Sequence, residues 1–366
     1  MNDSIKISKS FTVKDWKELR PQLLNSNDKW HEAIQIFEDR IESRFFNPIE
    51  KIKLEGKNEG EGFSIALISV VLLEFLAAFE LGKIYRTTKE GLSPCEYYSG
   101  SRILKSFLNN SCVFKSHFES NTKIQNFYEN IRCGLVHESR TLNNDVIISE
   151  SSIKNTQIQK IYFKEDGEFR LNRDLFISKI KEHIVYVKNR LEDNHIVTRK
   201  NFILKMDEIT GLNHVWYFIY GSNLFESQLE QRLNELNEVY LRKERCSLEG
   251  FNFIYNKESK DGTSKGNIFE KGDGIVKGVA ILLQEKNMLD EFIKKWEPGY
   301  DKLEVIISSE NSLNNNEKMQ FKAYTCISNK ICSLPPSKEY VSRIIKGAFE
   351  NDLPKEYISK YFEFFA

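Results

Sequence analysis

The residues best suited to chemistry form a short turn, Tyr220-Gly221-Ser222-Asn223-Leu224, which follows the apolar run 215–219. The aromatic and β-branched residues of that run predict a strand. The glycine and serine after it predict a tight turn. Consecutive backbone N–H groups in such a turn converge on one point and can hold an anion such as a carboxylate. Segment 220–224 is therefore a candidate binding site, with Ser222 as a turn hydroxyl rather than a nucleophile.

Further segments follow this turn in a definite order. Residues 266–269 and 274–279 come next, and the tail carries Ala323-Tyr324, Leu334-Pro335-Pro336-Ser337 and the segment 340–357. Together with the turn, these segments resemble the γ-glutamylcyclotransferase (AIG2-like) family, and the resemblance implies two strands over 266–269 and 274–279. The resemblance implies a mixed β-barrel with flanking helices over residues 214–366.

The resemblance also implies a reaction and a substrate class. In that family, the α-amine of a γ-glutamyl group attacks its own side-chain amide, which releases an amine and leaves 5-oxoproline. The chemistry needs a turn that holds the α-carboxylate, which falls here on 220–224, and a carboxylate base. Tyr300 matches a family tyrosine near the substrate. A γ-glutamyl small molecule or a related carboxylate is therefore the expected ligand.

The family's base glutamate is missing from its expected position. It lies three residues after the Asp of a Leu-Asp pair and seven before a tyrosine; counts from Asp290 and from Tyr300 both give Ile293. Isoleucine cannot accept a proton, so the resemblance implies a domain that binds a ligand without cyclising it. The alternative base is Glu297, which shares a face with Ile293 if segment 288–296 is helical.

A second candidate site is the Arg-x4-His spacing of Arg132 and His137, at the end of a predicted helix. Arginine stays charged and can hold a phosphate through two hydrogen bonds. Histidine can exchange a proton with a ribose hydroxyl near neutral pH. This motif resembles the HEPN superfamily, and the resemblance implies RNA cleavage without a metal, at a site completed by a second copy of the chain.

The Arg132 and His137 motif also has a structural alternative. The spacing occurs by chance in many helices, and a histidine after Gly134 is favoured by the dipole at a helix C-terminus. Glu74 and Glu80 lie within an apolar helix, where an unpaired carboxylate is unfavourable. Either one of them pairs with Arg132, or both face solvent.

These residues must be positioned by the surrounding elements. Apolar residues at helical spacing predict helices over 30–41, 63–83, 97–108, 117–135 and 176–191, the last one capped by Asn172 or Asp174. Short β-prone runs at 146–148, 161–163 and 169–171 predict a small β excursion. The predicted fold class is α+β multidomain: an all-helical HEPN-like bundle with that excursion over residues 1–195, and the barrel over 214–366. Residues 196–213 are predicted to be a linker with a short strand or helix around 202–205, and 311–317 a surface loop.

Composition excludes several function classes. The chain has 366 residues and a formal net charge of zero, so two or three domains are expected, and no global field draws the chain to nucleic acid or membranes. Its six cysteines form no CxxC pair and no zinc-finger spacing, and neither a metal nor another cofactor is expected. The apolar stretch 63–82 contains two glutamates and fits a buried helix better than a membrane span. With no signal peptide predicted in residues 1–17, a cytoplasmic location is expected.

Three hypotheses follow. The first is a homodimeric HEPN-like endoribonuclease joined to a regulatory γ-glutamylcyclotransferase-like domain, in a bacterial toxin or an antiphage effector. The second is a γ-glutamylcyclotransferase that releases 5-oxoproline with Glu297 as a displaced base. The third is a non-catalytic interaction protein gated by a ligand.

Overall fold

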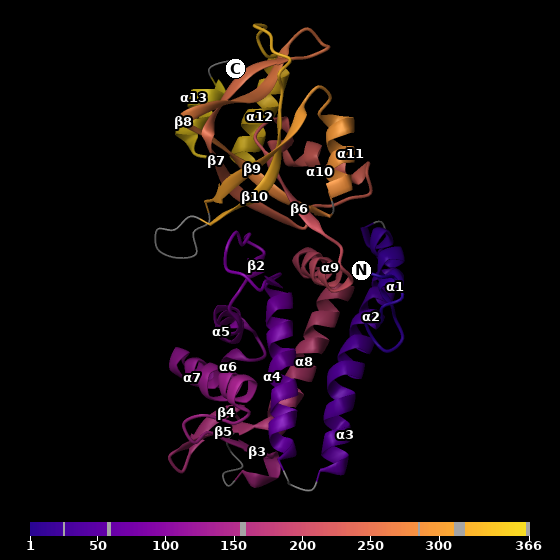
Figure 1. Cartoon of the computed structure of the whole chain (residues 1–366), viewed down its shortest axis with the longest axis vertical. Helices are drawn as coiled ribbons and strands as arrows, with labels where there is room; N and C mark the ends of the chain where they lie inside the picture. Colours follow the sequence, from indigo (N-terminus) through magenta and orange to yellow (C-terminus); the bar gives the residue numbers. More distant parts are fainter. Residues whose placement is uncertain (25, 57–59, 154–158, 285, 311–318, 364–366) are drawn as a thin grey trace. The chain divides into compact units, whose positions relative to one another are not determined.

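The chain folds into two compact units, seen in a computed structural model that describes residues 1–24, 26–56, 60–153, 159–284, 286–310 and 319–363 (Figure 1). Unit 1 comprises residues 1–87 and 97–210, and unit 2 comprises residues 88–96 and 211–366. The surface loop predicted over 311–317 lies outside the described residues. The protein is of the mixed α+β class, with helices dominating unit 1 and a closed barrel in unit 2.

Unit 1 is a helical bundle with short strands. Its helices and helical turns are α1 (Val13–Leu19), η1 (Arg20–Leu24), α2 (Trp30–Ile41), the π-helical η2 (Glu42–Phe46), α3 (Asn47–Glu55), α4 (Glu61–Glu80), α5 (Gly100–Asn110), α6 (Lys115–Phe118), α7 (Asn121–Asn126), the π-helical η3 (Phe127–Glu138), η4 (Glu150–Ser152), α8 (Arg173–Glu192) and α9 (Ile196–Thr210). The β excursion is a three-stranded sheet in the order β3 (Val146–Ile148), β5 (Glu168–Asn172) and β4 (Tyr162–Glu165). Strands β1 (Ile84–Tyr85) and β2 (Glu96–Tyr97) pair separately.

Most predicted elements of unit 1 are confirmed, and the helix predicted over 117–135 is divided. The helix is interrupted at Glu119, whose φ of 56° lies in the left-handed region. The Ser120 side chain then caps α7 by accepting a hydrogen bond from the Lys123 N–H, which is the usual role of serine before a helix. At α8, the predicted cap is Asn172, which accepts from the Leu175 N–H.

The segment predicted to be a linker is instead the core helix α9. Phe202 on this helix is fully buried, and its ring meets those of Trp16, Trp30, Phe37 and Phe79 edge to face. Asp207 is buried too, where it accepts a hydrogen bond of 2.9 Å from the Trp16 indole. Because partnered polar residues such as Asp207 interrupt its apolar face, the helix has a weak helical period in the sequence. Unit 1 therefore ends at Thr210 rather than at residue 195.

Helix α4 runs through unit 1 beside α8 (Figure 1). It is the one helix among the described residues that is long and apolar enough to cross a membrane, with a mean hydropathy of 2.3 in its most apolar window. Such a helix is also typical of a soluble core, and α4 packs against α5, α8 and α9. Of its polar residues, Glu74 pairs with an arginine and Glu80 lies next to a histidine ring; both contacts are described below with the sites.

Unit 2 is built on a closed five-stranded barrel in the order β10-β6-β8-β7-β9. The strands are β6 (His214–Ile219), β7 (Arg242–Glu258), β8 (Ser264–Gln284), β9 (Asp301–Ser309) and β10 (Gln320–Ile327). All adjacent pairs are antiparallel except β10 with β6. The two strands predicted over 266–269 and 274–279 are one continuous strand, β8. A Cβ atom on Gly278 would lie 2.1 Å from the Ile219 carbonyl oxygen, so only glycine lets β8 lie so close to the end of β6.

The helical elements of unit 2 flank the barrel. They are η5 (Ser222–Leu224), α10 (Glu226–Asn234), α11 (Lys286–Trp296), α12 (Lys338–Glu350) and α13 (Lys355–Tyr361). Contacts join α12 to η5, α10 to both η5 and α11, and α11 to β6 and β8. Helices α10, α11 and α12 therefore lie around the turn that follows β6.

The role of α9 can be tested by stability. We expect Phe202→Ala to lower the free energy of unfolding by about 3–5 kcal/mol, because the substitution leaves a cavity among four aromatic rings. Val197→Ala on the same helix is the control, since Val197 is 54% exposed and its truncation should change stability by less than about 0.5 kcal/mol. Chemical denaturation measures both. Equal, small effects of the two substitutions would mean that residues 196–210 behave as a linker.

Candidate functional site

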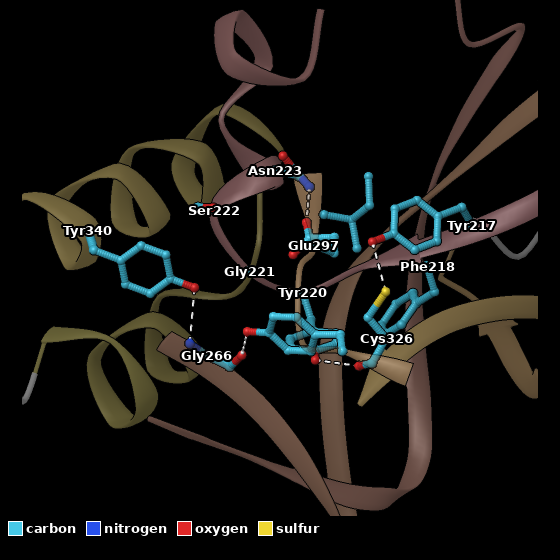
Figure 2. A pocket seen from close by; sticks show the side chains of 12 residues that line it. Tyr217, Phe218, Tyr220, Gly221, Ser222, Asn223, Gly266, Glu297, Cys326 and Tyr340 are labelled. Carbon is cyan, nitrogen blue, oxygen red and sulfur yellow. Dashed lines mark hydrogen bonds between the residues drawn. The ribbon is translucent and has the colours of Figure 1, made fainter. Parts of the chain in front are cut away.

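The predicted turn lines a small pocket in unit 2, at the end of β6 (Figure 2). The lining residues come from β6, the turn, β8, the segment after α11, β10 and α12. They are Tyr217, Phe218, Ile219, Tyr220, Gly221, Ser222, Asn223, Gly266, Glu297, Tyr300, Cys326 and Tyr340. Five of the six residues predicted to bind substrate are among them: Tyr220, Gly221, Ser222, Asn223 and Tyr300. The sixth, Leu224, is buried and lies outside this lining.

Helix α12 holds the turn in place. A Cβ atom on Gly347 would lie 2.2 Å from the Phe225 nitrogen, so glycine is required for the helix to pack so close to η5. The Asn351 side-chain amide donates a hydrogen bond of 2.7 Å to the Leu224 carbonyl. Gly221 and Ser222 therefore enter the pocket on a backbone that is anchored from outside it.

The structure brings Glu297, and not Ile293, into the pocket. The N–H of Glu297 donates to the Ile293 carbonyl at 2.9 Å, so the helical turn at the end of α11 extends to Glu297. Ile293 is buried and does not line the pocket. The Asn223 side-chain amide donates to Oε1 of Glu297 at 2.5 Å, and an Nη1 atom of Arg232 lies 3.8 Å from the same oxygen. A carboxylate thus stands beside the predicted turn, one helical turn beyond the family position.

Burial makes the Glu297 carboxyl an unusually weak acid. The side chain of Glu297 is only 18% exposed, and burial raises the pKa of its carboxyl to about 7. Arg232, the hydrogen bond from Asn223 and Lys257 act in the opposite direction on that pKa. A carboxyl with a pKa near 7 can both accept and return a proton at neutral pH, as a general base and acid must.

Tyrosine hydroxyls form the opposite wall of the pocket. Tyr300 donates to the Gly266 carbonyl at 2.5 Å, and the Gly266 N–H donates to the Tyr340 hydroxyl at 3.0 Å. Tyr220 donates to the Cys326 carbonyl at 2.5 Å. Burial raises the pKa of Tyr220, Tyr300 and Tyr340. These phenols therefore stay neutral and act as hydrogen-bonding groups.

Two groups near Glu297 were missed from the sequence. Tyr340 matched the family tail without an assigned role, and only the packing of α12 on the barrel brings it to Gly266. Arg232 lies on α10, where its Nη1 atom donates to Oδ1 of Asn223 at 2.6 Å. Arg232 lies nine residues after Asn223, a spacing that belongs to no known motif. Only the direction of α10 in the fold could have identified Arg232 as a partner of Asn223.

Ser222 does not have the surroundings of a nucleophile. Its Oγ accepts a hydrogen bond of 3.2 Å from the Gln228 amide. No histidine is among the residues that line the pocket. The prediction of a turn hydroxyl agrees with this arrangement.

The second predicted pair, Arg132 and His137, lies on η3 in unit 1. Nη1 of Arg132 is 3.4 Å from Nε2 of His137, and His137 is exposed. Nη2 and Nε of Arg132 donate to one carboxylate oxygen of Glu74 at 2.8 and 3.0 Å. The predicted pairing of Arg132 with a carboxylate of the apolar helix is thus confirmed for Glu74. Glu80 instead lies 3.1 Å from the ring of the buried His183.

Close packing supports the Glu74 and Arg132 pair. A Cβ atom on Gly100 would lie 2.0 Å from Oε1 of Glu74, so a larger residue where α5 passes this carboxylate would push the carboxylate aside. Arg132 also lies over the ring of Tyr128, 5.7 Å from its centroid, and Lys105 lies 5.2 Å from the same centroid. The result is a partly exposed cluster with two cations and one imidazole.

Within the described residues, no group of three or more His, Cys, Asp or Glu side chains could hold a metal ion. Neither candidate site contains an acidic cluster of the kind that Mg²⁺ needs.

Comparisons with known proteins concern only part of the chain. No family model and no curated protein matches it. One solved structure that resembles it is a γ-glutamyl cyclotransferase, with 24% identity over 40% of this chain and 86% of that one and a TM-score of 0.34. Another is an uncharacterized protein from Homo sapiens, with 25% identity over 40% of this chain and 85% of that one and a TM-score of 0.33. A third is a glutathione-specific γ-glutamyl cyclotransferase from yeast, with 13% identity over 41% of this chain and 94% of that one and a TM-score of 0.32. At such low TM-scores, the likeness by itself assigns no activity to this chain.

The raised pKa of Glu297 predicts a pH-dependent stability. Between the ordinary value of 4.5 and about 7, the folded protein binds more protons than the unfolded chain, so stability falls as the pH rises. We expect the wild type to lose roughly 1–3 kcal/mol more than Glu297→Gln between pH 5 and pH 8. Urea denaturation at both pH values measures the difference. Glu291→Gln, at an exposed position of α11, is the control; equal pH dependence of Glu297→Gln and wild type would contradict the assignment.

Proposed function

We propose that unit 2 converts γ-glutamyl compounds to 5-oxoproline, with Glu297 as the base. One observation carries this proposal: a buried carboxylate with a pKa of about 7 lies in the same pocket as the 220–224 turn. The hypothesis of binding without turnover depended on Ile293, and Glu297 supplies the group that Ile293 lacks. The order of motifs from residue 215 to the C-terminus supports the same reaction.

The proposed reaction begins with the substrate held at the turn. The substrate α-carboxylate would be held by backbone N–H groups of the turn, since consecutive N–H groups in a Gly-Ser turn can converge on one anion. Glu297 takes a proton from the substrate α-ammonium, and the freed amine attacks the side-chain carbonyl carbon. A C–N bond forms, and the carbonyl oxygen becomes an oxyanion.

Collapse of this intermediate completes the cyclisation. The bond to the original amide nitrogen breaks, and that nitrogen leaves with the proton returned by Glu297. Glu297 then takes the second proton from the ring nitrogen, which leaves the neutral lactam, and passes it to the departing amine. The Tyr340 hydroxyl accepts one hydrogen bond from Gly266, so its own proton can be directed to the oxyanion. Because the attacking amine and the carbonyl belong to one molecule, binding in a folded pose removes much of the entropic barrier.

We expect the purified chain to release 5-oxoproline from a panel of γ-glutamyl amino acids, peptides and amines, as measured by mass spectrometry. Glu297→Gln should lower kcat by about 10²–10⁴-fold, because the proton has no acceptor. The rate should rise with pH and level off above about 7, since the base must be ionised. Glu291→Gln should match the wild type. A Glu297→Gln variant as active as the wild type, or no product from any substrate, would overturn the proposal.

A second candidate function belongs to unit 1. We propose that Arg132 and His137 cleave RNA without a metal, in a homodimer in which two copies of the motif share one strand. The observation that favours this function is the 3.4 Å approach of His137 to an Arg132 that Glu74 orients. Lys105 adds a second cation beside Tyr128, which suits a phosphate backbone. A cytoplasmic toxin or antiphage effector, regulated by the ligand of unit 2, would use such an activity.

RNA cleavage is tested by incubating the purified protein with structured RNA and, separately, with single-stranded RNA, in the presence of a chelator. We expect Arg132→Ala and His137→Ala each to reduce cleavage by at least about 10²-fold, because phosphate binding or proton transfer is lost. His31→Ala, at another exposed histidine of unit 1, is the control. Cleavage that persists in both variants, or none in the wild-type dimer, would count against a nuclease.

A further inference from the structure

Helix α10 presents two donors to one atom of the turn. Gln228 and Arg232 lie four residues apart, so they occupy one face of the helix. The Gln228 amide donates to Oδ1 of Asn223 at 3.1 Å, and Nη1 of Arg232 donates to the same oxygen at 2.6 Å. Leu229 and Leu233, on another face, are buried and anchor the helix.

These contacts determine which way the Asn223 amide points. Oxygen and nitrogen of such an amide are assigned from their partners. A guanidinium can only donate, so the Asn223 atom that faces Arg232 must be the oxygen. The NH₂ group of Asn223 is then directed to Glu297, where it donates at 2.5 Å.

Arg232 is itself held in position beside the carboxylate. Its guanidinium lies over the ring of Trp296, with Cζ 5.0 Å from the centroid, and Trp296 directly precedes Glu297 in the chain. The side chain of Arg232 is 19% exposed, and its Nη1 atom is 3.8 Å from Oε1 of Glu297. A positive charge at this distance and in this partly dry environment interacts strongly with a carboxylate.

We propose that Arg232 is a positioning residue which, through Asn223, orients the Glu297 carboxylate for proton transfer and offsets its negative charge. This inference rests on the proposed cyclisation. It also explains how a base can work one helical turn beyond the family position: a carboxylate displaced into a buried site is tolerated only if it is hydrogen-bonded and paired.

The other titratable groups near Glu297 are neutral or hydrogen-bonded to another partner, as follows. Burial raises the pKa of the carboxyl, and Arg232 is the largest influence that lowers it. The further groups are Lys257 on β7, Tyr217 on β6, Tyr220 at the end of β6, Cys326 on β10, Tyr300 before β9 and Tyr340 on α12. Burial raises the pKa of the tyrosines and of Cys326, so these groups are neutral. The ammonium of Lys257 donates to the Pro298 carbonyl at 2.9 Å.

The test compares Arg232→Met, Arg232→Lys and the control Lys295→Met. Lys295 lies 4.9 Å from the same Trp296 ring, but its partner is Glu235, outside the pocket. Two measurements are made on the full chain: the pH profile of 5-oxoproline release, and the titration of Glu297 by NMR of ¹³C-labelled glutamate, assigned by its loss in Glu297→Gln.

In Arg232→Met, we expect the midpoint of the Glu297 titration to move to higher pH by about one unit or more. The rising limb of the pH profile of 5-oxoproline release should move by the same amount. The rate should therefore fall about tenfold at pH 6 and recover most of the wild-type value above pH 9, which a merely structural defect would not do. Arg232→Lys keeps the charge and should shift the titration less. Lys295→Met should leave both curves in place.

The outcomes separate the inference from the proposed function. Turnover by the wild type with an unmoved pH limb in Arg232→Met would overturn the role of Arg232 and leave the cyclisation standing. Absence of product from the wild type, with the NMR titration still shifted, would overturn the cyclisation and retain the electrostatic coupling. If Arg232→Met does not fold, an Arg232→Lys variant that matches the wild type in both curves overturns the inference, because the hydrogen bond from the guanidinium to Asn223 is then dispensable.

Discussion

The contact between the Glu297 carboxylate and the Asn223 amide joins the parts of unit 2 on which the candidate site depends. Glu297 is supplied by the end of α11, Asn223 by the turn after β6, and the orienting Arg232 by α10. A buried carboxylate without partners would be strongly unfavourable, so the three segments must meet for the pocket to exist. The closed barrel makes this meeting possible, because it fixes the end of β6 against β8 and β10, while α12 anchors the turn from its other side.

Much of this arrangement could be predicted from local sequence. The run 215–219 and the Gly-Ser turn have strong local preferences, and the strand and turn were found where those preferences place them. The candidate base was harder to place because motif spacing and helix geometry disagree. Both counts from flanking residues give Ile293, whereas the turn that extends α11 carries Glu297 into the pocket, as the hydrogen bond from its N–H to the Ile293 carbonyl shows. The helical relation between the two positions was visible in the sequence, but which of them faces the substrate depends on how α11 packs on the barrel.

The errors in unit 1 have a related cause. The segment of helix α9 was predicted to be a linker. Arg199 and Asp207 interrupt its apolar pattern, yet both are buried with partners: the Arg199 guanidinium donates to Asn194 at 2.7 Å, and Asp207 accepts from Trp16. A pattern based on hydrophobic period counts such residues as exposed. The partner of Asp207 is distant in sequence, so tertiary contacts alone reveal that this helix belongs to the core. By contrast, the β excursion and the Asn172 cap depend on short-range preferences, and both were predicted.

The two candidate sites use the same pair of charges in opposite ways. In unit 1, Glu74 holds two nitrogens of Arg132 and leaves Nη1 directed at His137, so the carboxylate orients the arginine toward an exposed imidazole. In unit 2, Arg232 is directed at Asn223 and holds the amide that contacts Glu297, so the arginine orients the carboxylate. The third side chain at each pair, His137 in unit 1 and Asn223 in unit 2, decides whether the arginine or the carboxylate is the group that is oriented. A neutral amide transmits orientation without exchanging protons, whereas an imidazole can itself take one near neutral pH. Under the two proposed functions, the same ion pair would serve acid–base chemistry at a carboxylate in one unit and phosphate chemistry at a guanidinium in the other.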